Sequence, residues 1–256
     1  GKLGLAGMRC MHIFEPFGMG WYSALQNRSF PVTIADFAHG ALPGRSTEGA
    51  LYSINSACWR CHDFGLSYSV SNYDCRNAFP STSSDAMKAH HEKHVKFTDQ
   101  PFATQKRKGT SIHVDTGDTK FTMLIREGDV QGHTTAAKDF VSIYTPRVES
   151  WVEYLEKRNN TYGWTKTTDP ISHKEVDIGT ITFVDDVTKL HIHDFHPNCE
   201  KVVEQLNLAT ESLDGILSET KHALNQSKTN HLVSVRGRGS HNVCREIHAA
   251  SSIHGA

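Results

Sequence analysis

The sequence predicts an α+β fold in which helices back one face of an antiparallel sheet. Apolar residues recur at helical spacing in three long stretches, and the shorter runs between them alternate or are rich in β-forming residues. Two of the β-rich runs flank a turn signature of the kind that joins antiparallel neighbours. Strands and helices follow one another without an internal repeat, which favours a mixed fold over an all-helical or repeat architecture.

The first half of the chain contains four predicted segments. Residues 1–45 are rich in glycine, proline and aromatic side chains without a sustained period, so we expect loops and short elements there. Cap residues followed by apolar residues three and four apart predict a helix over 47–62. Alternation predicts a strand over 66–74, ending at Asp74. Cap candidates and an acidic first turn predict a helix over 83–96.

The rest of the chain begins with a hairpin around residues 116–118. A long amphipathic helix follows over 136–155, and Pro146 is expected to kink it or to interrupt its hydrogen bonding. Apolar residues along one face predict another helix that starts near residue 199 and stops near Asn225. A short β-rich run over 231–235 supplies the last strand.

Two further strands, within 175–195, meet at the adjacent carboxylates of Asp185 and Asp186. A plain hairpin turn is the structural alternative for this pair. Because Asp74 also ends a strand, the three side chains converge at one edge of the sheet if the strands are neighbours. Divalent cations neutralise such a cluster, and Mg²⁺ prefers carboxylates plus phosphate oxygens. The pattern favours phosphoryl transfer with two metal ions about 3.5–4 Å apart.

The bulk composition is that of a soluble globular protein, with 256 residues, 38% hydrophobic and 21% charged. No apolar run approaches the roughly 18 residues of a membrane span, and the N-terminus lacks a signal-peptide layout. Six scattered cysteines fit a reducing compartment. We therefore predict an intracellular protein, in nucleus or cytoplasm, without a membrane partner. The chain starts at Gly1 and its first methionine is Met8, so we expect a fragment or excised domain.

The net charge of −1 excludes a global basic field for nucleic acid, so any such partner must be held by local patches. The nearest patch is the basic run at 106–108, for which a solvated loop is the simpler interpretation. The 17 histidines lack a complete ligand set at a convincing spacing, which favours surface or partly buried histidines over a zinc site.

Five sequence boxes resemble those of reverse transcriptases, in particular the enzymes of retrotransposons without long terminal repeats. They occur in the family's order from about residue 39 to 235, most of the chain. The boxes are HGALPGRSTEGAL (39–51), YDCRNAFPST (73–82), REGDVQGHTTAAKDF (126–140), FVDD (183–186) and LNQSKTNHLV (224–233).

The resemblance implies the fingers and palm of a right-hand polymerase, with the thumb absent or truncated. It implies partial fingers over 1–65 and a palm over 66–240, with a fingers-like insertion at about 97–127. Residues 241–256 would begin the connection between palm and thumb.

The resemblance also implies metal-binding roles. Asp74, Asp185 and Asp186 would form the metal site: Asp74 and Asp185 would hold two Mg²⁺ ions, with Mn²⁺ as an alternative, and Asp186 would support the site electrostatically. Cys75 would offer its backbone carbonyl. Together with Lys228, the three aspartates are the predicted catalytic residues.

Five residues are implied to contact substrates or template. Phe79 would lie under the sugar of the incoming nucleotide and reject a 2′-hydroxyl by bulk. Gln131 and Gly132 would let the chain pass close to the nascent base pair and template. Lys228 would approach the triphosphate, where a cation stabilises or protonates the leaving pyrophosphate. Arg45 is a candidate template or phosphate contact.

The implied reaction is template-directed attack of a primer 3′-hydroxyl on a deoxynucleoside triphosphate, with pyrophosphate leaving. Its partners would be an RNA template, a DNA primer, the dNTP and the rest of a longer retroelement polyprotein. One alternative is an RNA-dependent RNA polymerase, which shares the aspartate boxes, and another is a degenerate retroelement fragment without activity. A haem or metal-binding module at Cys58–His62 is the third, because Cys-x-x-Cys-His is a haem attachment signature.

Overall fold

The computed structural model describes residues 16–29, 34–109, 111–115, 117–124, 136–158, 160–193 and 197–250. The chain divides into two compact units, which we describe separately. One unit comprises residues 1–33 and 77–143. The other comprises 34–76 and 144–256 and contains the main sheet.

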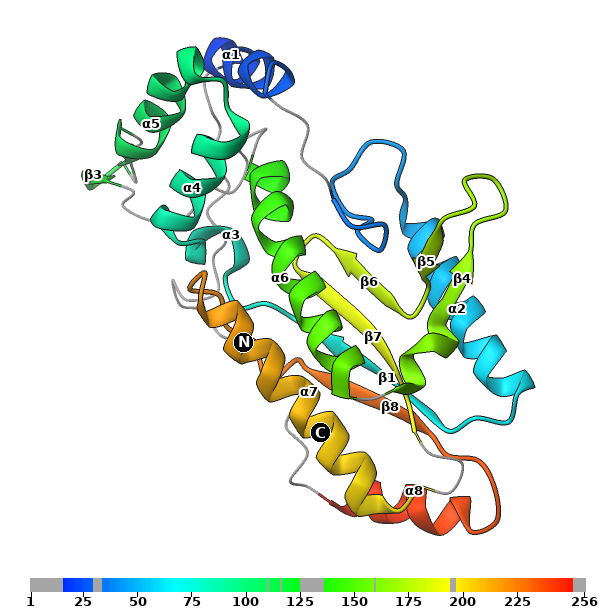
Figure 1. Ribbon diagram of the computed structural model, residues 1–256. Helices are drawn as coiled ribbons and strands as arrows, with labels where there is room; N and C mark the ends of the chain where they lie inside the picture. The colour runs from blue at the N-terminus through cyan, green and yellow to red at the C-terminus, as the bar shows by residue number, and fades with distance from the viewer. Residues whose placement is uncertain are drawn as a thin grey trace. The chain divides into compact units, whose positions relative to one another are not determined.

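The main sheet has four strands in the order β6-β7-β1-β8, and every neighbouring pair is antiparallel (Figure 1). In the register, Tyr73 lies opposite Val187, and Phe183 lies opposite Asp186. The antiparallel sheet predicted from the sequence is therefore confirmed. Its strands are β1 (Tyr68–Tyr73), β6 (Thr180–Phe183), β7 (Asp186–Ile192) and β8 (Asn230–Ser234).

Helix α2 (Thr47–Asp63) covers one face of this sheet. Its N-cap is Ser46, whose Oγ accepts a hydrogen bond from the Gly49 amide at 3.1 Å. The buried side of the helix packs against Leu190 and Ile192 of β7. The predicted helix at 47–62 is confirmed. The residues that α2 buries are Ala50, Ile54, Ala57 and Cys61.

Helices α6 (Ala136–Arg158) and α7 (Cys199–Ser218) cover the opposite face, and in Figure 1 both run in roughly the same direction as the strands. The Trp151 ring of α6 lies edge-on to His191, which alternates along β7 with the residues facing α2. Helices thus cover both faces of the sheet, whereas the sequence predicted cover on one. The reason is β7 itself, because it is buried from Lys189 to Ile192 and presents residues to both layers.

The sheet face under α6 and α7 is unusually polar. His193 lies 3.0 Å from Ser69 Oγ through Nε2 and 2.7 Å from Gln205 Oε1 through Nδ1. Burial is the main cause that holds the pKa of His191 well below its ordinary value, so this ring stays neutral in the core. Lys189 is buried here as well. Several histidines therefore serve packing and hydrogen bonding.

Of the two long helices, α6 agrees with the prediction and α7 differs from it at its C-terminal end. α6 continues through Pro146, so proline removes one amide donor without ending the helix. α7 ends at Ser218 rather than near Asn225, because the chain turns at Lys221, whose φ of 64° is left-handed. Helix α8 (Ser240–Ala249) was not predicted.

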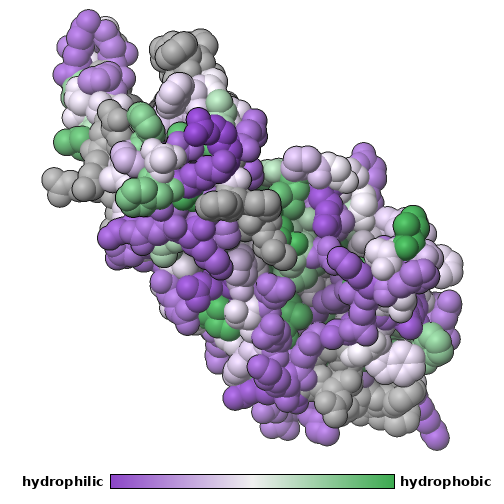
Figure 2. All heavy atoms as spheres, turned by 45° about the horizontal axis from the view of Figure 1, so that its top comes forward, coloured by the Kyte–Doolittle hydropathy of each residue, from purple (hydrophilic) through white to green (hydrophobic). Residues whose placement is uncertain are grey.

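A small hairpin and a 3₁₀ helix complete the larger unit. The hairpin pairs β4 (Lys166–Thr168) with β5 (Glu175–Asp177), and η3 (Asn160–Thr165) precedes it. Among the residues described, no helix is long and apolar enough to cross a membrane. On the face shown in Figure 2, hydrophilic side chains predominate and hydrophobic residues form small, separate patches.

The smaller unit is mainly helical, and its predicted helix near 83–96 and hairpin around 116–118 are confirmed. The basic run at 106–108 lies in α5, so the interpretation of this run as a loop was wrong. Trp21 of α1 meets Phe102 of α5 edge-on, with 5.8 Å between ring centroids. The elements are α1 (Pro16–Asn27), α3 (Ala78–Ser81), α4 (Ser84–His94), η2 (Phe97–Asp99), α5 (Gln100–Gly109), β2 (Ser111–Asp115) and β3 (Lys120–Leu124).

Candidate active site

The adjacent aspartates lie at the tight turn between β6 and β7. Phe183 and Asp186 pair across the two strands, so Val184 and Asp185 are the only residues of the loop. Val184 has a φ of 60°, a left-handed conformation that β-branched residues rarely adopt. The two-residue loop and the strand end together present Asp185 and Asp186 at one end of the sheet.

Asp74 lies at the same end of the neighbouring strand. It directly follows Tyr73, which pairs with Val187, the residue after Asp186. Burial is the largest cause of a raised pKa at Asp186, and the negative charges of Asp185 and Asp74 raise it further, while Lys228 opposes them. The carboxylates therefore interact electrostatically across the two strands.

A segment after α7 supplies the cation and the amide that contact Asp74. Asn225 Nδ2 donates to Asp74 Oδ2 at 2.9 Å, and its backbone amide donates to the Asp74 carbonyl at 2.8 Å. Lys228 Nζ lies 3.3 Å from both carboxylate oxygens of Asp74. The Lys228 side chain is 56% exposed and that of Asp74 is 22% exposed, so this ion pair borders solvent.

Backbone pairing holds this segment against the end of β1. Leu224 forms an antiparallel bridge with Cys75, and the Arg76 amide donates to the Ala223 carbonyl at 2.8 Å. Asp214 of α7 accepts from the Leu224 amide at 2.8 Å. The sequence placed this segment at the end of a helix, and the bridge to β1 was missed because it depends on pairing over a long distance in the chain.

Two buried residues, Tyr144 and Cys75, lie close to the carboxylates. The Tyr144 hydroxyl donates to the Asp185 carbonyl at 3.2 Å. Burial, followed by the nearby thiol and carboxylates, raises the pKa of Tyr144 well above its ordinary value, so the phenol keeps its proton. Burial likewise raises the pKa of Cys75 to about 12. From the sequence, Tyr144 was only one of the residues on the apolar face of the predicted helix over 136–155. A hydroxyl on that face was the one signal that could have indicated a role at the site.

Two of the remaining predicted substrate residues, Phe79 and Arg45, are described by the structure, and each has other neighbours. Gln131 and Gly132 lie outside the described residues. Phe79 belongs to the smaller unit, where its ring lies 5.1 Å from that of Phe140. Arg45 donates to the backbone carbonyl and to the carboxylate of Asp36.

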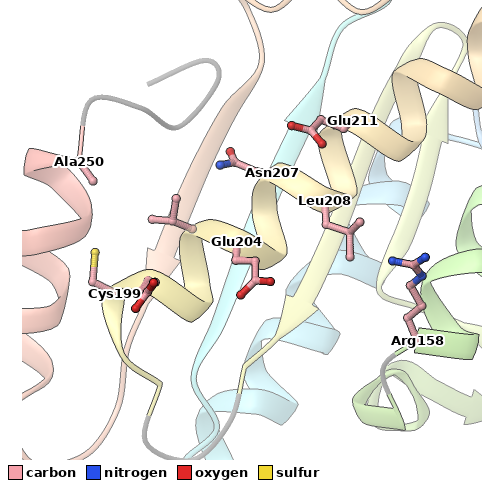
Figure 3. Close-up of a pocket in the computed structure, with 9 residues that line it drawn as sticks. Arg158, Cys199, Glu204, Asn207, Leu208, Glu211 and Ala250 are labelled. Carbon is pink, nitrogen blue, oxygen red and sulfur yellow. The ribbon is translucent and has the colours of Figure 1, made fainter.

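Arg45 also lines a cavity of about 680 Å³ between the start of α2 and the β4–β5 hairpin. A second cavity, of about 720 Å³, follows the outer side of α7 (Figure 3). Glu200, Glu204 and Glu211 line it, which makes it unfavourable for a polyanion. Neither cavity includes Asp74, Asp185 or Asp186.

The carboxylate cluster fits a cation site that a substrate completes. Among the residues described, no three His, Cys, Asp or Glu side chains could by themselves hold a metal ion. Mg²⁺ commonly takes only one or two protein carboxylates and completes its shell with water and phosphate oxygens. Burial is the largest cause of the raised pKa of Asp186, and a divalent cation would relieve the repulsion from Asp185 and Asp74 that adds to it.

The Cys-x-x-Cys-His segment lies on α2, and its second cysteine serves packing. Cys61 is 2% exposed within the core formed with Leu66 and Leu190. Burial is the main cause that raises the pKa of its thiol to about 11. Covalent haem attachment requires this thiol to be accessible, so its burial argues against the haem alternative.

For a Mn²⁺ ion held by this cluster, as the sequence predicts, we expect the affinity to fall with acidification. The fall should begin at a higher pH than at a site built from ordinary aspartates, whose pKa is about 3.9. The reason is the raised pKa of Asp186, since only the deprotonated carboxylate favours a cation. Because the pKa of Asp186 is higher in the folded state than in the unfolded state, the ionised carboxylate lowers the free energy of unfolding. This loss disappears as the pH falls through the folded-state pKa. Mn²⁺ titrations between pH 5 and 8 on wild type and Asp186→Asn measure this, and identical pH profiles would contradict it.

Comparison with known proteins identifies the fold. No family model and no curated protein matches the sequence. Apo telomerase from Candida tropicalis, truncated from its C-terminal domain, matches with a TM-score of 0.55 and 10% identity over 79% of this chain and 37% of that chain. Apo telomerase from the same organism matches with a TM-score of 0.53 and 8% identity over 79% of this chain and 34% of that chain.

Telomerase from C. tropicalis in complex with the TWJ fragment of telomeric RNA also matches, with a TM-score of 0.52 and 11% identity over 88% of this chain and 33% of that chain. The chain thus spans about a third of the length of these telomerases. Its fold is similar to part of these telomerase structures.

Proposed function

We propose that the chain is the fingers and palm part of an RNA-directed DNA polymerase, of the kind that retrotransposons without long terminal repeats encode. The observation that carries the proposal is the meeting of Asp74 with the Asp185–Asp186 turn on adjacent strands, with Lys228 on Asp74. These residues belong to three of the ordered sequence boxes, and the telomerase-like fold supports the same class.

Asp74 and Asp185 would hold two Mg²⁺ ions, or Mn²⁺, while Asp186 adds negative charge. When bound, such ions activate the primer 3′-hydroxyl and neutralise the charge that develops on the triphosphate. Asn225 keeps the Asp74 carboxylate in place through its 2.9 Å hydrogen bond, and Tyr144 fixes the backbone of Asp185. The protein's contribution is to orient the carboxylates before substrate arrives.

Lys228 is proposed to exchange partners during the reaction. It pairs with Asp74 in the protein alone, and its half-exposed side chain can turn toward the triphosphate once cations neutralise that carboxylate. At the leaving pyrophosphate it would stabilise charge or donate a proton.

The remaining roles follow from the resemblance. We propose that 66–240 form the palm, with partial fingers at 1–65, an insertion at about 97–127 and the palm–thumb connection starting at 241. Phe79 would exclude a 2′-hydroxyl, and Gln131 and Gly132 would border the nascent base pair. Cys75 would offer its carbonyl to a cation, and Arg45 would contact template or phosphate. An RNA template, a DNA primer and the rest of a retroelement polyprotein would be the partners.

Primer extension tests the proposal. The chain is incubated with Mg²⁺, a DNA primer on an RNA template, and either dNTPs or NTPs. Extension with dNTPs is the expected result, whereas use of NTPs alone would indicate an RNA polymerase. A chain that is folded by circular dichroism but extends nothing would be a degenerate fragment.

Lys228→Met is expected to lower the rate of nucleotide addition by about 10²-fold, the lower end of the contribution of a general acid. The loss should appear in single-turnover extension at saturating dNTP, because the ammonium acts as the pyrophosphate leaves. Lys201→Met, at an exposed position in the first turn of α7, is the matched control. Equal rates for the two variants would remove Lys228 from the mechanism.

A further inference from the structure

The turn that carries Asp185 has a conformation that its own sequence disfavours. Val184 adopts a φ of 60°, where its branched side chain meets steric strain. Asn-Gly or a similar pair is the usual choice for a two-residue hairpin. A strained backbone of this kind persists only when the surrounding structure imposes it.

A segment before α2 lies along the outer edge of β6, next to this turn. The Thr182 amide donates to the Phe37 carbonyl at 3.0 Å, and the His39 amide donates to the Thr182 carbonyl at 2.8 Å. Ala38 forms a parallel bridge with Thr182 and is 1% exposed. These bonds fix the position of the residue that follows, Gly40.

Gly40 approaches the turn so closely that no other residue fits. A Cβ at this position would lie 2.3 Å from the Val184 nitrogen, 2.7 Å from its Cγ2 and 2.8 Å from the Phe183 carbonyl carbon. Two of the three atoms are backbone, so the clash cannot be relieved by a side-chain rotation. Gly40 is required by this close approach and not by a positive φ.

The turn is also held from the α6 layer. The Tyr144 hydroxyl donates to the Asp185 carbonyl at 3.2 Å. Gly40 therefore restricts the turn at Val184 while Tyr144 restricts it at Asp185.

We propose that Gly40 is a positioning residue: its contact with Val184 selects the left-handed turn that presents the Asp185 and Asp186 carboxylates. This inference rests on the proposed function for its catalytic consequence, and its effect on cation binding can be measured without catalysis.

Gly40→Ala is expected to weaken Mn²⁺ binding at least about tenfold, measured by electron paramagnetic resonance of the free ion, and to lower the rate of extension at saturating dNTP. Gly179→Ala is the matched control, because its Cβ would lie 2.5 Å from the Thr165 side chain at the other end of β6. The control should lose thermal stability and keep Mn²⁺ affinity. Equal effects of the two substitutions on Mn²⁺ binding would overturn the proposal.

The double variant Gly40→Ala/Val184→Gly separates positioning from stability and remains usable if the single variant does not fold. Glycine at 184 lets the turn take another conformation, so thermal stability should recover while Mn²⁺ binding stays weak. Recovery of both would mean that Gly40 acts only on stability. If wild type binds Mn²⁺ but extends no primer, the polymerase proposal fails while the positioning test stands. A wild type that binds no Mn²⁺ overturns both.

Discussion

Asp185→Asn is expected to reduce primer extension by at least about 10³-fold. The substitution removes one negative charge from the cluster and changes almost nothing in shape. Charge stabilisation by bound metal ions is worth several kcal/mol, and about 4 kcal/mol corresponds to three powers of ten in rate. Tyr144 donates to the backbone carbonyl of residue 185, so the contact that orients the turn is retained in the variant.

The measurement is single-turnover extension of a DNA primer on an RNA template with Mg²⁺, together with thermal unfolding. Asp63→Asn at the exposed C-terminal end of α2 is a control for a generic loss of charge. Unchanged unfolding with lost extension would support a role in catalysis. A variant that extends the primer at the wild-type rate would show that the two aspartates form a plain hairpin turn and have no catalytic role.

Local signals were sufficient for much of the secondary structure. Helix α2 begins where Ser46 caps it, and the β2–β3 hairpin forms around Gly117, whose φ of 85° needs glycine. The sequence also predicted the strand ends at which Asp74, Asp185 and Asp186 lie. It could do so because side-chain alternation and turn preferences depend on only a few neighbouring residues. These features depend on near neighbours in the chain, which is why a single sequence reveals them.

Features that depend on distant residues were not predicted. Lys228 pairs with Asp74, which lies 154 positions away in the chain. The sequence box therefore identified the lysine but could not show that it pairs with Asp74 in the absence of substrate. The cover of both sheet faces depends on how α2 and α6 pack on β7. Helix α5 was missed because its basic run, which has no apolar period, resembles a loop, although α5 packs Phe102 against Trp21. The roles of Gln131 and Gly132 stay predictions.

Lys189 is the clearest example of a residue whose environment its sequence position does not suggest. Its side chain is 0% exposed, and Nζ lies 3.1 Å from Asp177 Oδ2 and 2.5 Å from Thr180 Oγ1. Burial acts to raise the pKa of Asp177, but the Lys189 charge and the hydrogen bonds from Thr180 and Gly179 outweigh it and lower that pKa. The pair connects β7 to the end of β5.

Lys189→Met is expected to cost about 3–5 kcal/mol of unfolding free energy at neutral pH, because it leaves the buried Asp177 carboxylate without its cation. For a chain of this size the melting temperature should fall by roughly 10 °C. Lys221→Met, in the exposed turn after α7, should change it little. The double variant Lys189→Met/Asp177→Leu should recover much of the loss, since replacing both partners removes the uncompensated charge.

The pH dependence of the unfolding free energy distinguishes loss of the ion pair from loss of packing in Lys189→Met. In the wild type the pKa of Asp177 is lowered, so its contribution to stability is present above the unfolded value of about 3.9 and is lost as pH falls through the folded value. Without Lys189 the pKa of Asp177 loses the largest of the causes that lower it, so the carboxylate of the variant takes up its proton at a higher pH and is relieved of its charge on acidification. The difference in unfolding free energy between wild type and Lys189→Met should therefore shrink between about pH 7 and pH 4 in urea titrations. A difference that stays constant over this range would assign the loss to packing of the lysine stem instead of to the ion pair.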